Sequence, residues 1–456
     1  MPKLDLSTSP KAIWRLIWPQ MVMMYFMFFM TLTSVWVAGQ ISADVQASLG
    51  ILGQGAFFLM VVIMSISSGA LAAVSQSLGA LKLKRAQRYI ATTVFGSLVL
   101  GIIMAFLGYA FSESLLKVIM IPESIMPITR EIWTVSMITL PAQYIYSATG
   151  VMFRATRQVI APLWVTGIIC IINILGCLGF GLGFMGLPNF GYMGIVWTNF
   201  GVHCLGAIFN CFLLVKSEYL DMKVLPKMKW LKVGLPYLMK VALPAGAAQL
   251  VWQSGYLTLF VLVASLPVDS VNALAGLTAG LRAEGLLILP GMAFNMTVSV
   301  LVGNSLGAGK PEQAKKISLN MTAIASFFLT LLAIVLWPFR QEISELLSND
   351  IGTQAQIFSY LTYNFLSTPF SVASTVMGGI MIGAGAPIYN MIVYGGSFWF
   401  IRLPLGYLFG HMLWGTSEGI FIAMLISQAL QTIIMLYVVV YCNWSRFAMR
   451  KHIHKV

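Results

Sequence analysis

Two charged residues are expected deep inside apolar stretches that are long enough to cross a lipid bilayer. Glu284 falls in the apolar run 272–303, and Arg402 falls in the run 387–411. A charged side chain inside a bilayer is costly, so it is usually retained for a function. Burial favours the neutral form of a carboxyl group, which can then bind and release a proton near neutral pH. Glu284 is therefore the candidate ion-coupling residue.

A structural role for Glu284 competes with this interpretation. Arg402 is expected to contact Glu284 and to neutralise both charges, as a fixed ion pair would. Arg282 is two residues from Glu284, and on a helix that spacing points the two side chains in different directions. A structural pair would be needed for folding, whereas a coupling carboxyl group would be needed only for function. Both interpretations remain open.

Uncharged polar residues inside the apolar runs form a second group of candidates. Amide side chains that face lipid cost free energy, so some of these residues must line a cavity and others must bridge helices. The first candidates for a cavity lining are Asn173, Gln253 and Gln54. No ATP-binding GxxxxGK[ST] loop, HExxH motif or cluster of metal ligands occurs in the sequence. Neither catalysis nor a cofactor is expected.

The composition explains why the charged residues must be sought inside apolar runs. Of 456 residues, 59% are hydrophobic and 9% are charged, whereas soluble domains carry about 25% charged residues. Most of the surface must therefore face lipid, and the bilayer is an expected partner. The net charge of +13 resides in short connections, so it does not indicate binding of nucleic acid.

Basic connections alternate with neutral or acidic ones, which is the pattern of a multi-pass protein with basic loops in the cytoplasm. The pattern places both termini in the cytoplasm, and the cytoplasmic (inner) membrane of a bacterium or archaeon is the expected location. The basic connections are marked by Lys11, Arg15, Lys82, Arg85, Arg154, Arg157, Lys216, Lys232, Lys310, Lys316 and Arg446.

The apolar runs predict twelve membrane-spanning helices, because they are continuous and do not alternate as barrel strands would. They cover residues 14–38, 48–76, 90–111, 129–153, 160–183, 192–215, 237–266, 272–303, 317–338, 355–383, 387–411 and 416–441.

An internal repeat divides these runs into two sets of six. The stretch Ser77–Lys82 returns as Ser305–Lys310, and the same offset of 228 residues places Pro141 on Pro369 and Gly150 on Gly378. The predicted domains are residues 1–225 and 226–456, two six-helix lobes. Because six is even, the lobes enter the bilayer in the same direction and are related by a parallel pseudo-twofold repeat.

Glycines spaced four residues apart predict close contacts between helices. Two such pairs inside apolar runs are Gly179 with Gly183 and Gly379 with Gly383.

The second half also carries motifs that resemble a known family. The runs Gly280–Gly291 and Val302–Glu312, followed by Trp399–Leu405, are similar to the second half of multidrug and toxic compound extrusion (MATE) transporters. The likeness is closest to the DNA-damage-inducible branch, within the multidrug/oligosaccharidyl-lipid/polysaccharide flippase superfamily. The resemblance implies two lobes around a central cavity, and export driven by a proton or sodium gradient.

The chain departs from the family pattern in the first half. Thr33 stands where the first span of the family usually carries an aspartate, and Cys177 replaces the acid that follows Asn173 by four residues. The usual proton relay of the first lobe is therefore missing. Thr33 and Arg402 join Asn173, Gln253 and Gln54 as candidates for the substrate cavity.

The resemblance implies a secondary active exporter of small amphipathic or organic solutes, coupled to protons or sodium and working by alternating access. A monomer is expected. Two alternatives remain: a flippase for lipid-linked precursors, and a membrane sensor or assembly partner that transports nothing.

Overall fold

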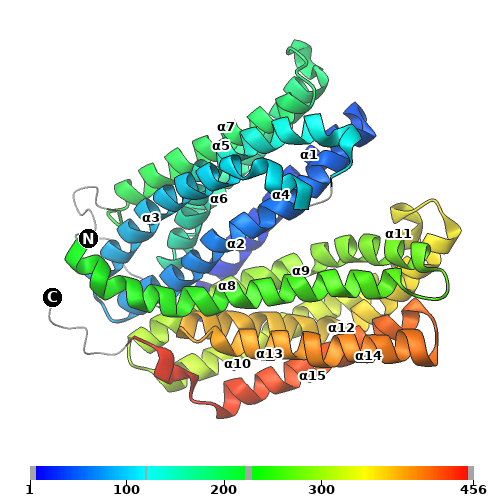
Figure 1. Cartoon of the computed structure of the whole chain (residues 1–456). Helices are drawn as coiled ribbons and strands as arrows, with labels where there is room; N and C mark the ends of the chain where they lie inside the picture. The colour runs from blue at the N-terminus through cyan, green and yellow to red at the C-terminus, as the bar shows by residue number, and fades with distance from the viewer. Residues whose placement is uncertain (1–6, 119–120, 221–227, 450–456) are drawn as a thin grey trace. The chain divides into compact units, whose positions relative to one another are not determined.

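The computed structural model describes residues 7–118, 121–220 and 228–449, and in this part of the chain it contains helices and no strands (Figure 1). The first-half helices are α1 (Pro10–Ile41), α2 (Ala43–Gly79), α3 (Leu83–Ala110), α4 (Ser112–Val118), α5 (Met126–Ala155), α6 (Ile160–Leu182) and α7 (Tyr192–Lys216). The later helices are α8 (Met228–Ala264), α9 (Ser270–Gly307), α10 (Pro311–Leu336), α11 (Arg340–Leu347), α12 (Ile351–Ala384), α13 (Ile388–Ser397), α14 (Leu403–Tyr407) and α15 (Ser417–Tyr441).

Each of the twelve predicted spans coincides with one helical segment. Among the described residues, ten helices are long and apolar enough to cross a membrane. The other two predicted spans are α5 and the segment from α13 to residue 413. This last segment includes two π-helical stretches, η4 (Phe398–Arg402) and η5 (Leu408–Leu413), on either side of α14. The all-helical membrane fold is therefore confirmed.

Helix ends repeat at the predicted offset of 228 residues. α2 ends at Gly79 and α9 at Gly307, while α6 begins at Ile160 and α13 at Ile388. The short helices follow the same rule, since α4 begins at Ser112 and α11 at Arg340.

The turns that follow α2 and α9 have the same backbone hydrogen bonds. Lys82 N–H donates to the Ser77 carbonyl at 2.9 Å, and Lys310 N–H donates to the Ser305 carbonyl at 2.9 Å. Both turns need one residue with positive φ, which is Leu81 (59°) in the first and Gly309 (74°) in the second. Glycine adopts this conformation at little cost, whereas a side chain strains it.

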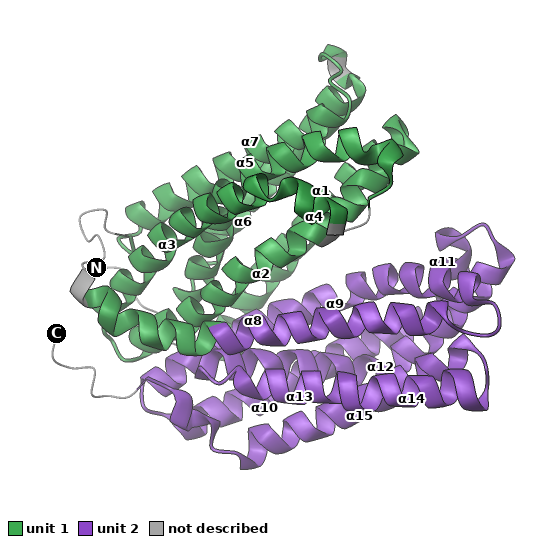
Figure 2. Cartoon of the chain, in the orientation of Figure 1, with its two compact units in different colours: residues 1–242, 454–456 green, residues 243–453 purple. Residues whose placement is uncertain are grey.

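The described residues divide into two compact units (Figure 2). Unit 1 ends at Ala242 and unit 2 begins at Leu243, so the division falls inside α8. The beginning of α8 packs in unit 1, where Tyr237 donates a hydrogen bond to the Gln76 side chain at 3.2 Å. The predicted boundary between residues 225 and 226 lies outside the described residues.

The two glycine pairs have different roles. A Cβ atom on Gly379 would lie 2.3 Å from the Asn295 carbonyl oxygen of α9, and one on Gly383 would lie 2.0 Å from that of Ser299. This pair therefore allows α12 to touch the backbone of α9, as predicted. Gly183, in contrast, ends α6 with a positive φ of 76°, so the predicted helix contact is not the role of that glycine.

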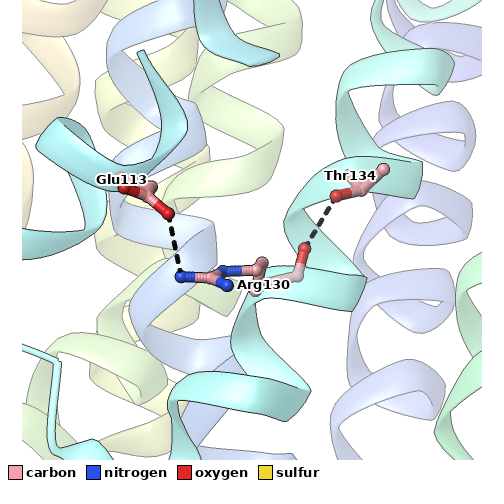
Figure 3. Close-up of polar contacts among 3 residues, drawn as sticks. All are labelled: Glu113, Arg130 and Thr134. Carbon is pink, nitrogen blue, oxygen red and sulfur yellow. Dashed lines mark hydrogen bonds and ion pairs between the residues drawn. The ribbon is translucent and has the colours of Figure 1, made fainter. Parts of the chain in front are cut away.

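At one end of unit 1, an ion pair joins α4 to α5 (Figure 3). The Arg130 guanidinium donates to Glu113 Oε1 at 3.3 Å, and both side chains are more than half exposed. The Thr134 hydroxyl donates to the Arg130 carbonyl one turn later at 2.9 Å. An exposed pair of this kind contributes little to stability.

Candidate functional site

Glu284 lies on α9 of unit 2, where its partner is a tyrosine of α12. The Tyr360 hydroxyl donates a hydrogen bond to Glu284 Oε2. Tyr360 is 2% exposed and its ring packs edge-on against Phe421, at 5.3 Å between centroids. The carboxyl group is thus held by a phenol that rigid packing fixes in place. Arg282 is exposed and does not take part in this hydrogen bond.

Arg402 lies in the π-helical stretch η4 and is 3% exposed. Its Nε donates to Ser427 Oγ at 2.9 Å, and its NH2 donates to Gln428 Oε1 at 2.7 Å. Both partners are neutral side chains of α15. The predicted contact with Glu284 is wrong: in the part of the chain that the structure describes, the two residues form no ion pair.

Aromatic rings occupy the space around the Arg402 guanidinium. Its central carbon lies 4.5 Å from the Phe398 ring centroid and 5.7 Å from that of Trp252. Such cation–π contacts offset part of the cost of burying a cation that has no anionic partner. Tyr256 packs against Phe398, at 5.1 Å between centroids, and lies within electrostatic range of both Arg402 and Glu284. One acid, one cation and an aromatic cluster therefore occupy the interior of unit 2.

The π-helical stretches have a cause in the sequence. Pro404, at the start of α14, has no N–H to donate to the preceding turn, so it interrupts the regular ladder there. Wide π turns are frequent at functional sites, because they redirect side chains that a regular helix would space evenly. Arg402 is the last residue of such a stretch.

Unit 1 has a neutral polar contact in place of these charges. The Asn173 amide nitrogen donates to Asn199 Oδ1 at 2.9 Å, and the Asn173 side chain is fully buried. The Cys177 thiol lies 4.0 Å from Asn173 Oδ1 and 3.8 Å from the Ser34 hydroxyl. Cys177 thus joins α6 to α1 through weak hydrogen bonds and carries no charge that could replace the missing acid.

The remaining predicted cavity residues are distributed over both units. Thr33 is partly buried on α1, and Gln253 is partly buried on α8. Gln54 falls in α2, and its side chain lies outside the described residues. The structure brings Glu284 and Arg402 into unit 2, and Asn173 and Thr33 into unit 1. Within the described ranges, no group of three metal-ligating side chains occurs.

Sequence reasoning missed Tyr360 and Tyr256. Both are ordinary members of apolar runs that contain several aromatic residues, and no local spacing distinguishes them. Only the packing of α12 and α8 reveals their proximity to Glu284. The Ser427–Gln428 pair was missed for the same reason, although Gln428 was visible as an amide inside an apolar run.

Comparison with known proteins finds relatives that span most of the chain. A probable multidrug resistance protein of Bacillus subtilis, YpnP, is 23% identical over 87% of this chain and 87% of its own length. The crystal structure of a mutant of the Vibrio cholerae MATE transporter VcmN has a TM-score of 0.86 and 17% identity, and covers 94% of this chain and 95% of its own. A MOP superfamily transporter from Pyrococcus furiosus has a TM-score of 0.83 and 18% identity, and covers 96% of this chain and 97% of its own.

The family model for MatE proteins matches residues 19–178 and 244–408. One stretch lies in each unit, so the match follows the internal repeat. This chain belongs to the MatE family of membrane transporters.

Proposed function

We propose that this protein is a secondary active exporter of small amphipathic organic solutes, coupled to a proton or sodium gradient. The observation that carries the proposal is the hydrogen bond between Glu284 and Tyr360 in the interior of unit 2. As a carboxylate, Glu284 accepts this bond; as a carboxylic acid, it can also donate one. Its protonation state therefore changes the contact between α9 and α12.

The aromatic cluster supports the choice of solute. Trp252 and Tyr256 are partly exposed and provide broad apolar faces around the buried Phe398, with centroids 5.1–5.4 Å apart. Such faces bind the flat, apolar groups of many different molecules, because contact with an aromatic ring does not require one fixed ligand shape. The relatives are described as multidrug resistance proteins, and the same class of solute is proposed here.

The charge pattern supports a proposed location. The basic connections favour cytoplasmic termini in a bacterial or archaeal cell, with the helices in its inner membrane. The protein acts as a monomer, and the two units alternate between inward and outward access.

The test is efflux from proteoliposomes under an imposed proton or sodium gradient, comparing the wild-type protein with Glu284→Gln. Glu342→Gln, an exposed change on α11, is the matched control. We expect gradient-driven efflux in the wild type and the control, and its loss in Glu284→Gln with normal thermal stability. Full gradient-driven efflux by a stable Glu284→Gln protein would exclude a coupling role.

A second candidate is a flippase for lipid-linked precursors, which the buried Arg402 favours because it has only neutral hydrogen-bond partners. For the Pyrococcus furiosus relative, reverse polarity of the binding pocket suggests a different function. In the same vesicles, a flippase would move a labelled pyrophosphate lipid and no soluble dye. A sensor would move neither.

A further inference from the structure

Arg154 is a partly buried cation of unit 1 that has no ion-pair partner in the part of the chain that the structure describes. It lies in the last turn of α5 and is partly buried; its Nε atom is fully buried and has no hydrogen-bond partner. Within the described residues it has neither an ion pair nor a ring partner, and the titratable side chain that faces it is Tyr146. The partial negative charge at the C-terminus of α5 offsets only part of the cost of burying this cation. The five N–H donors of a guanidinium still need acceptors.

Arg154 belongs to an accessible polar stripe along α5. The stripe consists of Gln143, Ser147, Gly150 and Arg154, spaced as positions i, i+4, i+7 and i+11, so it follows one face of the helix. All four residues are partly exposed, whereas most of the intervening positions are buried.

Packing accounts for the other faces of α5. Pro141 lies against α3, where a Cβ on Gly101 would be 2.7 Å from its Cα. The Tyr144 hydroxyl donates to the Leu59 carbonyl of α2. Thr149 accepts a hydrogen bond from Asn210 of α7 at 3.2 Å. The stripe is therefore the face of α5 that its packed neighbours α2, α3 and α7 leave uncovered.

The stripe borders open space at Gly150. A Cβ atom added there would meet no atom within 4 Å. The matching glycine of unit 2 is Gly378, where a Cβ would lie 2.5 Å from the Tyr394 hydroxyl oxygen. In unit 2 this position is thus filled, and in unit 1 it is empty.

An exchange of residues between helices explains the difference. In unit 2, Tyr394 of α13 donates to the Ser374 carbonyl of α12 at 2.5 Å. At the matching positions of unit 1, the tyrosine is on the other helix: Tyr146 of α5 bonds to the Thr166 hydroxyl of α6 at 3.2 Å. The Tyr146 ring packs on Gly206 and His203 of α7. No tyrosine therefore covers Gly150, and Arg154 follows it one turn later.

We propose that Arg154 and the space beside Gly150 form an anion subsite in unit 1, which binds the carboxylate or phosphate group of an amphipathic molecule. This inference rests on the proposed export function, because it assigns an anionic headgroup to the solute or to a lipid that shares its path. A guanidinium binds both groups through two parallel hydrogen bonds. Ser147 and Gln143 supply neutral donors along the same face for the rest of the headgroup.

The site is distinct from the charges of unit 2. Arg402 has its side-chain donors engaged by Ser427 and Gln428, whereas Arg154 has none engaged among the described residues. At the position that matches Arg154, unit 2 has the apolar Ile382. The subsite is therefore specific to unit 1.

The test measures binding and requires no gradient. Purified full-length protein in a maltoside detergent is titrated with 1-naphthyl phosphate and with uncharged 1-naphthol, and binding is followed by fluorescence anisotropy. We expect the phosphate to bind at least about tenfold more tightly than the naphthol, a difference of about 1.4 kcal/mol. Arg154→Gln should remove that preference, and Arg154→Lys should restore part of it.

Two further variants keep the test decisive. Gly150→Leu places a side chain in the space where a Cβ atom would meet no atom within 4 Å, and it leaves Arg154 intact. It should therefore also weaken phosphate binding about tenfold. Arg157→Gln removes the same charge three residues away, outside the stripe, and should leave binding unchanged. Equal phosphate binding by the wild type, Arg154→Gln and Gly150→Leu would overturn the proposal.

Native mass spectrometry identifies the source of the anion. If a co-purified phospholipid is retained by the wild type and lost from Arg154→Gln, the subsite holds a lipid headgroup. If naphthyl phosphate binds through Arg154 and no lipid is retained, the anion is a solute. Neither readout depends on Glu284. If gradient coupling fails while phosphate binding stays intact, the result counts against the export proposal and not against the anion subsite.

Discussion

Units 1 and 2 share several helix ends and differ in their interiors. Where unit 2 has the hydrogen-bonded pair of Glu284 and Tyr360, the matching positions of unit 1 are Ala56 and Ile132. Conversely, the open space beside Gly150 in unit 1 is filled by Tyr394 in unit 2.

The difference shows which parts of the repeat are constrained. Backbone hydrogen bonds define the turns that end α2 and α9, and these bonds are the same in both units. The side chains that face the interior are free to differ, because they contact residues from other helices of the same unit. The acid proposed for ion coupling thus lies in unit 2, and the partly buried Arg154, which forms no ion pair among the described residues, lies in unit 1.

The largest effect is expected where unit 2 needs glycine and unit 1 does not. Val151 and Ala155 of unit 1 match Gly379 and Gly383. Substituting these residues into unit 2, as Gly379→Val with Gly383→Ala, places Cβ atoms against carbonyl oxygens of α9. We expect the free energy of unfolding to fall by about 3 kcal/mol or more. Thermal unfolding in detergent, followed by tryptophan fluorescence, measures the change.

The control for this change is Gly396→Ala in α13, where a Cβ would meet no atom within 4 Å. That variant should be neutral or more stable by up to about 1 kcal/mol, because alanine favours the helix. If both variants unfold at the wild-type temperature, α9 and α12 are not in backbone contact.

A smaller effect is expected at the turns after α2 and α9. Leu81 has a positive φ and is 76% exposed, so it is strained and makes few contacts. Leu81→Gly should stabilise the protein and Gly309→Leu should destabilise it, each by about 1 kcal/mol. Thermal unfolding in detergent, followed by tryptophan fluorescence, measures both changes. Shifts of the same sign in the two variants would show that the two turns are not equivalent.

The smallest effect concerns the start of α12. Thr353 N–H donates to Asp350 Oδ2 at 2.7 Å, and this bond lowers the pKa of Asp350 below its usual value. α5, the matching helix of unit 1, begins after Ile125 and has no side-chain cap. A lowered pKa means that the stabilisation is present above the unfolded-state pKa, about 3.9, and is lost as the pH falls through the folded-state pKa.

The measurement compares unfolding temperatures of the wild type and Asp350→Asn from pH 7 to pH 3. Asparagine keeps the cap and has no charge to lose, so the advantage of the wild type should shrink only at the acidic end. A constant difference across the range would show that the ionised cap contributes nothing.

Much of the fold was predictable because it depends on local patterns. The length of the apolar runs determined the helices, and the repeat of Ser77–Lys82 at Ser305–Lys310 predicted the equivalent turns. The contact of Gly379 and Gly383 with α9 was also visible, since small residues four apart lie on one helix face. These features require no knowledge of which helices are neighbours.

The site was only partly predictable because its contacts join distant segments. Glu284 and Arg402 stood out as charges in apolar runs, yet their partners come from α12 and α15, and the expected pairing between them does not occur. Arg154 was interpreted only as one of the basic residues of a cytoplasmic connection. Its lack of partners depends on the packing of α5 against three other helices, which the sequence alone does not specify.

The constant offset between helix ends, from Gly79 and Gly307 to Ile160 and Ile388, has a consequence for the history of the gene. Since the two halves duplicated, this stretch has kept no net insertion or deletion. One inserted residue in α5 would rotate all later positions of the helix by about 100°. That rotation would turn the stripe from Gln143 to Arg154 away from its open face. Within this stretch, divergence between the halves has therefore proceeded by substitution at fixed length.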